Sequence, residues 1–129
     1  MYKLSSHEEF LCKEIVDAAF IVHSKLGPGV VEKIYEVCFC HELRKKGISF
    51  RRQVDLPIYY DDLTFDEGLR LDVLVDDLVV CELKAMMHLN EYWTAQTISN
   101  MKLAGKHVGF LINFHVPLIK QGIRRFYAD

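Results

Sequence analysis

A nearly continuous apolar run, Val108-Gly109-Phe110-Leu111-Ile112, constrains the fold of this chain most strongly. A strand made almost wholly of apolar residues has no face that it can present to water, so it belongs in the middle of a sheet covered on both faces. Helical patterns elsewhere in the chain can supply that cover. The run therefore predicts an α/β architecture.

Periodicity places the other elements around this strand. Ser5 and Glu8 have the spacing of a capping box that opens a helix, and two glycines around Pro28 separate this helix from a second one. The predicted helices cover residues 5–25, 30–46 and 91–104, and the predicted strands cover 49–60, 69–75, 78–84 and 108–112. The tail, 122–127, fits either a strand or a helical turn. The order ααβββαβ, with this short undecided C-terminal element, predicts one mixed sheet flanked by helices.

Length and composition bound the class of protein. The 129 residues suit one domain, 1–129, and half of them are hydrophobic while 26% are charged, as in globular proteins. The formal net charge of −2 neither favours nor excludes a polyanionic partner. We expect a cytoplasmic protein, because we find neither a secretory signal nor an apolar run long enough to span a bilayer. The spacing of the four cysteines matches no CxxC pattern and predicts small buried hydrophobes.

Three ionisable residues interrupt the two strands on either side of Asp76-Asp77. Asp72 lies within one apolar run, and Glu82 and Lys84 lie within the next, where alternation puts them on one face. Buried charges are costly unless they are paired or bound to a metal. Two carboxylates from neighbouring strands can hold one divalent cation beside a phosphate, and an amine can orient water or offset charge.

This interpretation imposes a condition on the connection between the two strands. With a clean two-residue turn at Asp76-Asp77, Asp72 would face Cys81, and the carboxylates of Asp72 and Glu82 would lie on opposite sides of the sheet. We therefore predict a three-residue or bulged connection, or a bend at Asp72.

Asp72 followed by Glu82-Leu83-Lys84 resembles the D…ExK signature of the PD-(D/E)xK nuclease superfamily. Gly29-Val30-Val31-Glu32-Lys33-Ile34-Tyr35 resembles the motif that names its GxxExxY branch. The resemblance also extends to Leu26-Gly27-Pro28-Gly29, Gln53-Val54, Ala95-Gln96 and Leu111-Ile112-Asn113-Phe114, and it covers about residues 26–125.

The resemblance implies a restriction-endonuclease-like core in which Asp72 and Glu82 bind Mg²⁺, with Mn²⁺ as an alternative, and Lys84 is the catalytic lysine. It also brings Glu32 and Gln96 to the site. In RecB-like relatives a tyrosine follows the glutamine by four residues, whereas this chain has Asn100 there. That departure bears on which DNA contacts the helix makes.

Each of these residues also has a structural interpretation. The charged trio could be an ion-pair network, Glu32 a solvated first-turn residue, and Gln96 a surface amide. Tyr35 lies on an apolar stripe, and we expect it to pack. The basic residues at 44–46, 51–52 and 124–125 are either a phosphate-binding rim or solvated faces. For most of the aromatic residues at 59–60, 92–93 and 126–127 we expect packing in the core or in a dimer.

Taken together, the sequence predicts a metal-dependent nuclease that hydrolyses phosphodiester bonds, in DNA rather than RNA. The alternative is a nuclease-fold module that binds nucleic acid or protein without cleavage, with a homodimer as one form of it. A third hypothesis, an enzyme acting on a small phosphorylated molecule, predicts a closed pocket in place of an open groove.

Overall fold

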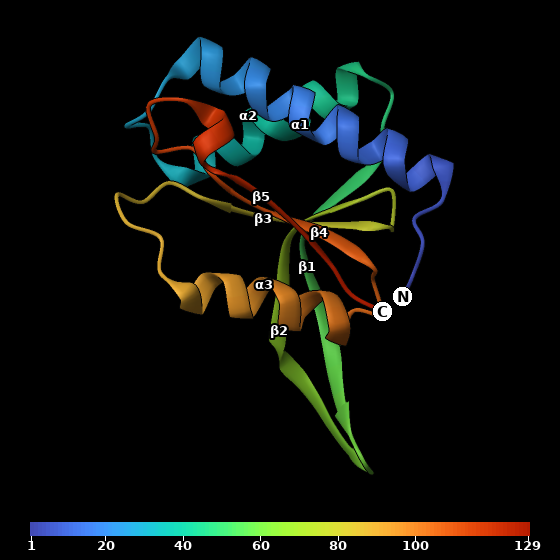
Figure 1. Cartoon of the computed structure of the whole chain (residues 1–129). Helices are drawn as coiled ribbons and strands as arrows, with labels where there is room; N and C mark the ends of the chain where they lie inside the picture. The colour runs from blue at the N-terminus through green and yellow to red at the C-terminus, as the bar shows by residue number, and fades with distance from the viewer.

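The computed structural model describes all 129 residues as one five-stranded sheet with helices on both faces (Figure 1). The helices are α1 (Ser6–Leu26), α2 (Glu32–Lys45) and α3 (Glu91–Leu103), with a short 3₁₀ turn, η1 (Ile119–Gln121). The strands are β1 (Phe50–Tyr60), β2 (Leu63–Val75), β3 (Val79–Lys84), β4 (Val108–Asn113) and β5 (Ile123–Tyr127). The predicted order is confirmed, and the undecided tail is a strand.

The strands follow one another across the sheet in the order β1-β2-β3-β4-β5. Only β3 and β4 are parallel, and α3 is the crossover that joins them, as a parallel pair requires. The predicted apolar strand is β4. It lies between β3 and β5, and all six of its residues are buried, so the prediction of an interior strand covered on both faces is confirmed.

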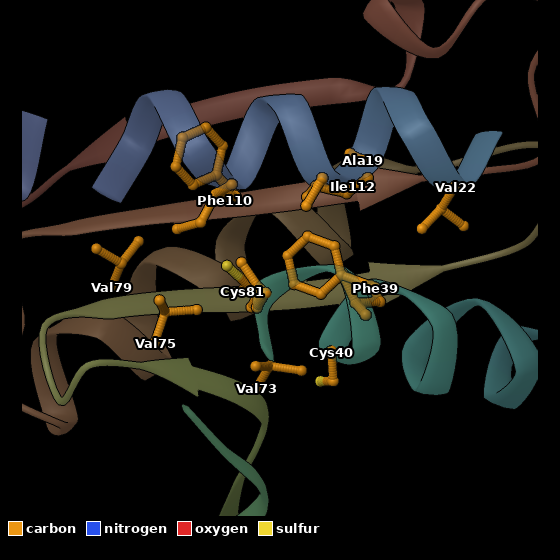
Figure 2. Close-up of a cluster of buried hydrophobic side chains, with 14 of the residues drawn as sticks. Ala19, Val22, Phe39, Cys40, Val73, Val75, Val79, Cys81, Phe110 and Ile112 are labelled. Carbon is orange, nitrogen blue, oxygen red and sulfur yellow. The ribbon is translucent and has the colours of Figure 1, made fainter. Parts of the chain in front are cut away.

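Two apolar clusters hold the layers together, one on each face of the sheet. The larger joins α1 and α2 to β2, β3 and β4, and Figure 2 shows residues such as Val22, Phe39, Cys81 and Phe110 meeting there. The smaller packs Met101 of α3 against the opposite face. Because both faces are covered, a charge on the central strands can escape burial only near a strand end or where strands separate.

The first two strands extend beyond this core as a protruding hairpin (Figure 1). The sequence predicts the second strand only from Leu69, whereas β2 begins at Leu63. The earlier part pairs with β1 as far as Tyr60↔Leu63, and all of residues 59–68 are exposed. Between Phe65 and Leu69 the register shifts, and the exposed residues 66–68 interrupt the apolar pattern, which explains the short prediction. We call residues 58–67 the arm.

Several local predictions are also confirmed. Ser5 and Glu8 form the capping box that begins α1. The cysteines are all free; Cys38 is half-buried and the other three are buried. None of the helices combines the length and the apolar character needed to cross a membrane.

Candidate active site

The connection between β2 and β3 brings the two predicted acidic residues to one face. Val75 pairs with Val79, so the turn between them contains three residues, as predicted. The register continues to Val73↔Cys81, which places Asp72 next to Glu82 along the ladder. Directly opposed residues of antiparallel strands share a face. The geometric condition set by the sequence is therefore met.

The side chain of Asp72 occupies the point where β2 and β3 separate. The ladder ends at Val73↔Cys81, and the next donor on β3, the backbone N–H of Leu83, donates a hydrogen bond of 2.9 Å to Oδ2 of Asp72. A carboxylate thus replaces a backbone carbonyl. This contact fixes the side chain of Asp72 next to Glu82.

Glu82 is the most strongly perturbed carboxyl group of the site. It is only 7% exposed. Burial, together with the neighbouring carboxylate of Asp72, raises the pKa of Glu82 from 4.5 to about 8, and the charge of Lys84 opposes this rise. Asn100 of α3 donates to Oε1 of Glu82 at 3.5 Å. Two neighbouring carboxyl groups that are shielded from water favour a shared proton or a bound cation.

Lys84 lies on the same face, next to the aromatic ring of α3. Its Nζ is 3.9 Å from the centroid of Trp93 and makes no ion pair within 4.0 Å. A cation–π contact of this kind holds the ammonium group without neutralising it. The charge of Lys84 therefore remains available to an anion at the site.

Glu32, the first residue of α2, approaches the trio from the helical layer. The residue is exposed, but its carboxylate is partly withdrawn from water. This burial raises the pKa of Glu32, the carboxylates of Asp72 and Glu36 add to the rise, and Lys84 opposes it. The structure thus brings Asp72, Glu82, Lys84 and Glu32 into one electrostatic group.

Gln96 does not share in these contacts. It is exposed on α3, and no hydrogen bond joins it to the other four residues. Trp93 and Asn100 face the trio instead, three residues before Gln96 and four residues after it. The sequence indicates Asn100 only as a departure from the pattern of RecB-like relatives, and it predicts no contact between Trp93 and Lys84.

The donor set fits one divalent cation held by two carboxylates. Nowhere in the chain do three His, Cys, Asp or Glu side chains converge as a metal cluster. Burial and the neighbouring carboxylate of Asp72 nevertheless raise the pKa of Glu82 to about 8, which favours a bound proton at neutral pH, and a cation can replace that proton. Mg²⁺ commonly takes one or two carboxylates and fills its remaining positions with water and phosphate oxygens.

A comparison with protein families decides the assignment. The family model described as the PD-(D/E)XK nuclease superfamily matches residues 9–126, nearly the whole chain. The chain belongs to this superfamily. No curated protein and no solved structure matches it. The mixed sheet with its three helices agrees with a restriction-endonuclease-like fold, and membership of a nuclease superfamily implies a nucleic acid substrate.

In this nuclease-superfamily chain, Tyr35 holds the loop that precedes Glu32. Its hydroxyl donates to the carbonyl of Gly27 and accepts a hydrogen bond of 3.1 Å from the N–H of Val30. The ring is fully buried and stacks on Phe114 at 4.5 Å. Tyr35 therefore packs, as expected, and it also fixes the entry to α2.

A second set of hydrogen bonds fixes the segment that follows Lys84. Buried Asn113 donates to the carbonyl of Met86 at 2.9 Å and accepts from its N–H at 3.1 Å. The N–H of Phe114 donates to the carbonyl of Lys84. These bonds tie the segment after β3 to the end of β4, so the position of Lys84 is set by the sheet.

Most of the predicted phosphate-binding rim is neutralised by acids. Lys46 pairs with Glu14 and Asp17, and Arg51 pairs with Asp77. Similar pairs join Arg52 to Glu36 and Lys45 to Glu42. Arg44, Arg124 and Arg125 have no acidic partner within 4.0 Å. These three cations, with Lys84, are what remains of the rim for a polyanion.

Proposed function

We propose that this chain is a divalent-metal-dependent nuclease that hydrolyses phosphodiester bonds in DNA. The observation that carries the proposal is the meeting of Asp72 and Glu82 at the point where β2 and β3 separate, with Lys84 beside them. Superfamily membership supports nuclease chemistry. The choice of DNA over RNA rests on the resemblance to restriction-endonuclease-like proteins.

Asp72 and Glu82 would hold Mg²⁺ or Mn²⁺. When bound, the ion supplies positive charge to the phosphate and makes water more acidic. Lys84 orients the attacking water or offsets the charge that develops on phosphorus. Glu32 borders the site and would accept a hydrogen bond from the attacking water. Gln96 would reach the substrate only from the exposed side of α3.

We further propose that the chain belongs to the GxxExxY branch and forms one domain over residues 1–129. Gly29, Glu32 and Tyr35 carry that motif. In the fold, Gly29 has a φ of 97°, which favours glycine, and Tyr35 braces the loop that it begins. The motif thus has a structural purpose, which is to place Glu32 beside Asp72.

The test is cleavage of single-stranded and double-stranded DNA and of RNA with Mg²⁺ or Mn²⁺. Asp72→Ala and Lys84→Ala should each lower the rate about 10²–10⁴-fold, because each removes charge from the reacting centre. Glu91→Ala, a change of an exposed acid at the start of α3, is the matched control and should leave the rate unchanged. Cleavage that survives both site substitutions would contradict the mechanism.

The second candidate is a nuclease-fold module that binds nucleic acid or protein without cleaving. The observation in its favour is that only two carboxylates meet, with no third metal-binding side chain. Calorimetry with Mg²⁺ separates the two. Heat of binding in the wild type that disappears in Asp72→Ala supports the nuclease, whereas nucleic acid binding without any Mg²⁺ uptake supports the module.

The third hypothesis, a small phosphorylated substrate, expects a closed pocket. The pocket beside the site has a volume of about 280 Å³ and opens to solvent. Its lining residues are Gly29, Val30, Val31, Ala85, Met87 and His115. An open pocket of this size suits part of a polymer better than an enclosed small molecule.

A further inference from the structure

The arm has one apolar face that covers nothing in its own chain. Ile58 pairs with Phe65 and Tyr60 with Leu63, so these four side chains share a face of the two-stranded ribbon. Tyr60, Leu63 and Phe65 are 66%, 52% and 49% exposed. Ile58, at the base, packs against the smaller core cluster. The face therefore continues that core out into solvent.

Such a ribbon needs a partner for physical reasons. An isolated two-stranded hairpin is only marginally stable in water, and contiguous exposed apolar side chains mark interaction sites. For the aromatic residues we expected packing in the core or in a dimer, and Tyr59 and Tyr60 do not pack in the core, because both are exposed. What remains of that expectation is an interface.

Charge limits what can cover the arm. Four carboxylates lie at or near its tip, and none of them forms an ion pair within 4.0 Å: Asp61, Asp62, Asp66 and Glu67. A nucleic acid is excluded as the occupant, since phosphates would be repelled. Packing two arms on each other would bring eight carboxylates together. The occupant must be apolar and basic.

The outer face of α2 has this complementary character. Ile34 and Val37 are 45% and 43% exposed along one helical stripe. Exposed basic residues flank them on the same face: Lys33, His41 and Arg44. The acidic residues of α2 lie elsewhere, with Glu36 and Glu42 buried and Glu32 at the first position. This face presents apolar and positive groups together.

We propose that the arm of one chain docks on the outer face of α2 of a second copy, in a reciprocal two-fold dimer. Within one chain the arm points away from the layer of α1 and α2 (Figure 1), so the contact forms between copies. Two-fold symmetry makes the contact twice. Each arm then needs to supply only half of the roughly 1,200–2,000 Å² that a stable interface buries. The proposal does not depend on cleavage activity.

The test measures association of the full chain by sedimentation velocity over a concentration series. We expect a reversible dimer in the wild type. Reversing charge on the arm (Asp66→Lys with Glu67→Lys) or on α2 (Lys33→Glu with Arg44→Glu) should raise the dissociation constant about tenfold or more. Combining the two pairs should restore the dimer, because each new charge again faces its opposite.

Two matched controls separate docking from general effects. Lys102→Glu with Lys120→Glu makes the same change of charge on exposed residues outside both faces and should leave the dimer intact. Leu63→Ser with Phe65→Ser should weaken it, whereas Leu103→Ser with Leu118→Ser, also exposed, should not. Far-UV circular dichroism and thermal unfolding verify that each variant is folded.

Two results would overturn the proposal. A wild-type chain that remains monomeric at every concentration leaves the arm to a different basic protein. A dimer that persists in both charge-reversed variants, or that the combined variant fails to restore, shows that these two faces do not meet.

Discussion

Strand β2 takes part in two hairpins. One of them exposes apolar side chains that proteins usually bury, and the other buries a carboxyl group that proteins usually expose. The arm turns at Asp61, whose φ is 52°, and the site hairpin turns at Asp76 and Asp77, with φ of 49° and 57°. The turns are similar in chemistry. Beyond them, the arm exposes apolar side chains, whereas the site hairpin buries a carboxyl group.

Each of these exceptions indicates an interaction that the isolated chain does not complete. A buried acid whose pKa is raised to about 8 is stabilised by a bound cation, and an exposed apolar face is stabilised by a protein surface. The same strand thus carries the proposed cation site at one end and the proposed docking face at the other. The two kinds of site differ in what departs from the usual burial: a buried acid indicates the cation site, and exposed apolar side chains indicate the docking face.

The largest expected effect is on the free energy of unfolding, when one leucine of each hairpin is replaced by alanine. Leu74 is 1% exposed in the site hairpin, and Leu63 is 52% exposed in the arm. Leu74→Ala should lower the free energy of unfolding by about 2–5 kcal/mol, because it leaves a cavity. Leu63→Ala should change it by no more than about 0.5 kcal/mol. Chemical denaturation at concentrations below self-association measures both, and equal losses would contradict the assigned exposure.

The next effect is the pH dependence that buried Glu82 gives to the metal-free chain. Its pKa is about 8 in the folded state and about 4.5 when unfolded, so the folded chain keeps a proton that the unfolded chain has lost. The stability from this group is full below about pH 4.5 and is lost as the pH rises to about 8. The slope for one proton is at most about 1.4 kcal/mol per pH unit.

Denaturation in a chelating buffer from pH 5 to pH 8.5 tests this dependence. Glu82→Gln should flatten the curve, and Asp72→Asn should flatten it in part, because burial remains as a cause. A wild-type curve that runs parallel to that of Glu82→Gln would show that Glu82 ionises normally in the fold.

Periodicity was enough to predict the core elements, because each buries a face that the sequence must encode. The three-residue turn followed from one requirement, that Asp72 and Glu82 share a side of the sheet. The second strand of the arm escaped prediction because Leu63, Thr64 and Phe65 pair with β1 without burial, and the register shift at residues 66–68 separates them from the buried part of β2.

The helix α3 shows a second limit. Spacing alone could not say which of its faces meets the sheet, and the resemblance pointed to Gln96. The structure turns Trp93 and Asn100 toward Lys84 and Glu82, while Gln96 remains exposed. Contacts between a helix and a strand distant in sequence depend on packing that no single periodicity contains.

The smallest expected effect is on the rate of cleavage when Asn100 is replaced. Asn100 is a positioning residue that acts through Glu82. Its amide donates to Oε1 of Glu82, and a donor favours the charged form of a carboxyl group. If cleavage is confirmed, Asn100→Ala should lower kcat/KM roughly 10–100-fold, as losses of supporting contacts do. It should also move the acidic limb of the pH–rate profile to higher pH.

Asn100→Asp separates this role from packing. A further carboxylate beside Glu82, in addition to Asp72, should move the same limb further up, whereas Ser99→Ala, at the exposed position just before Asn100, should leave it in place. A purely structural role would lower stability in both Asn100 variants without moving the profile. An unmoved limb would therefore show that the amide of Asn100 does not lower the pKa of Glu82.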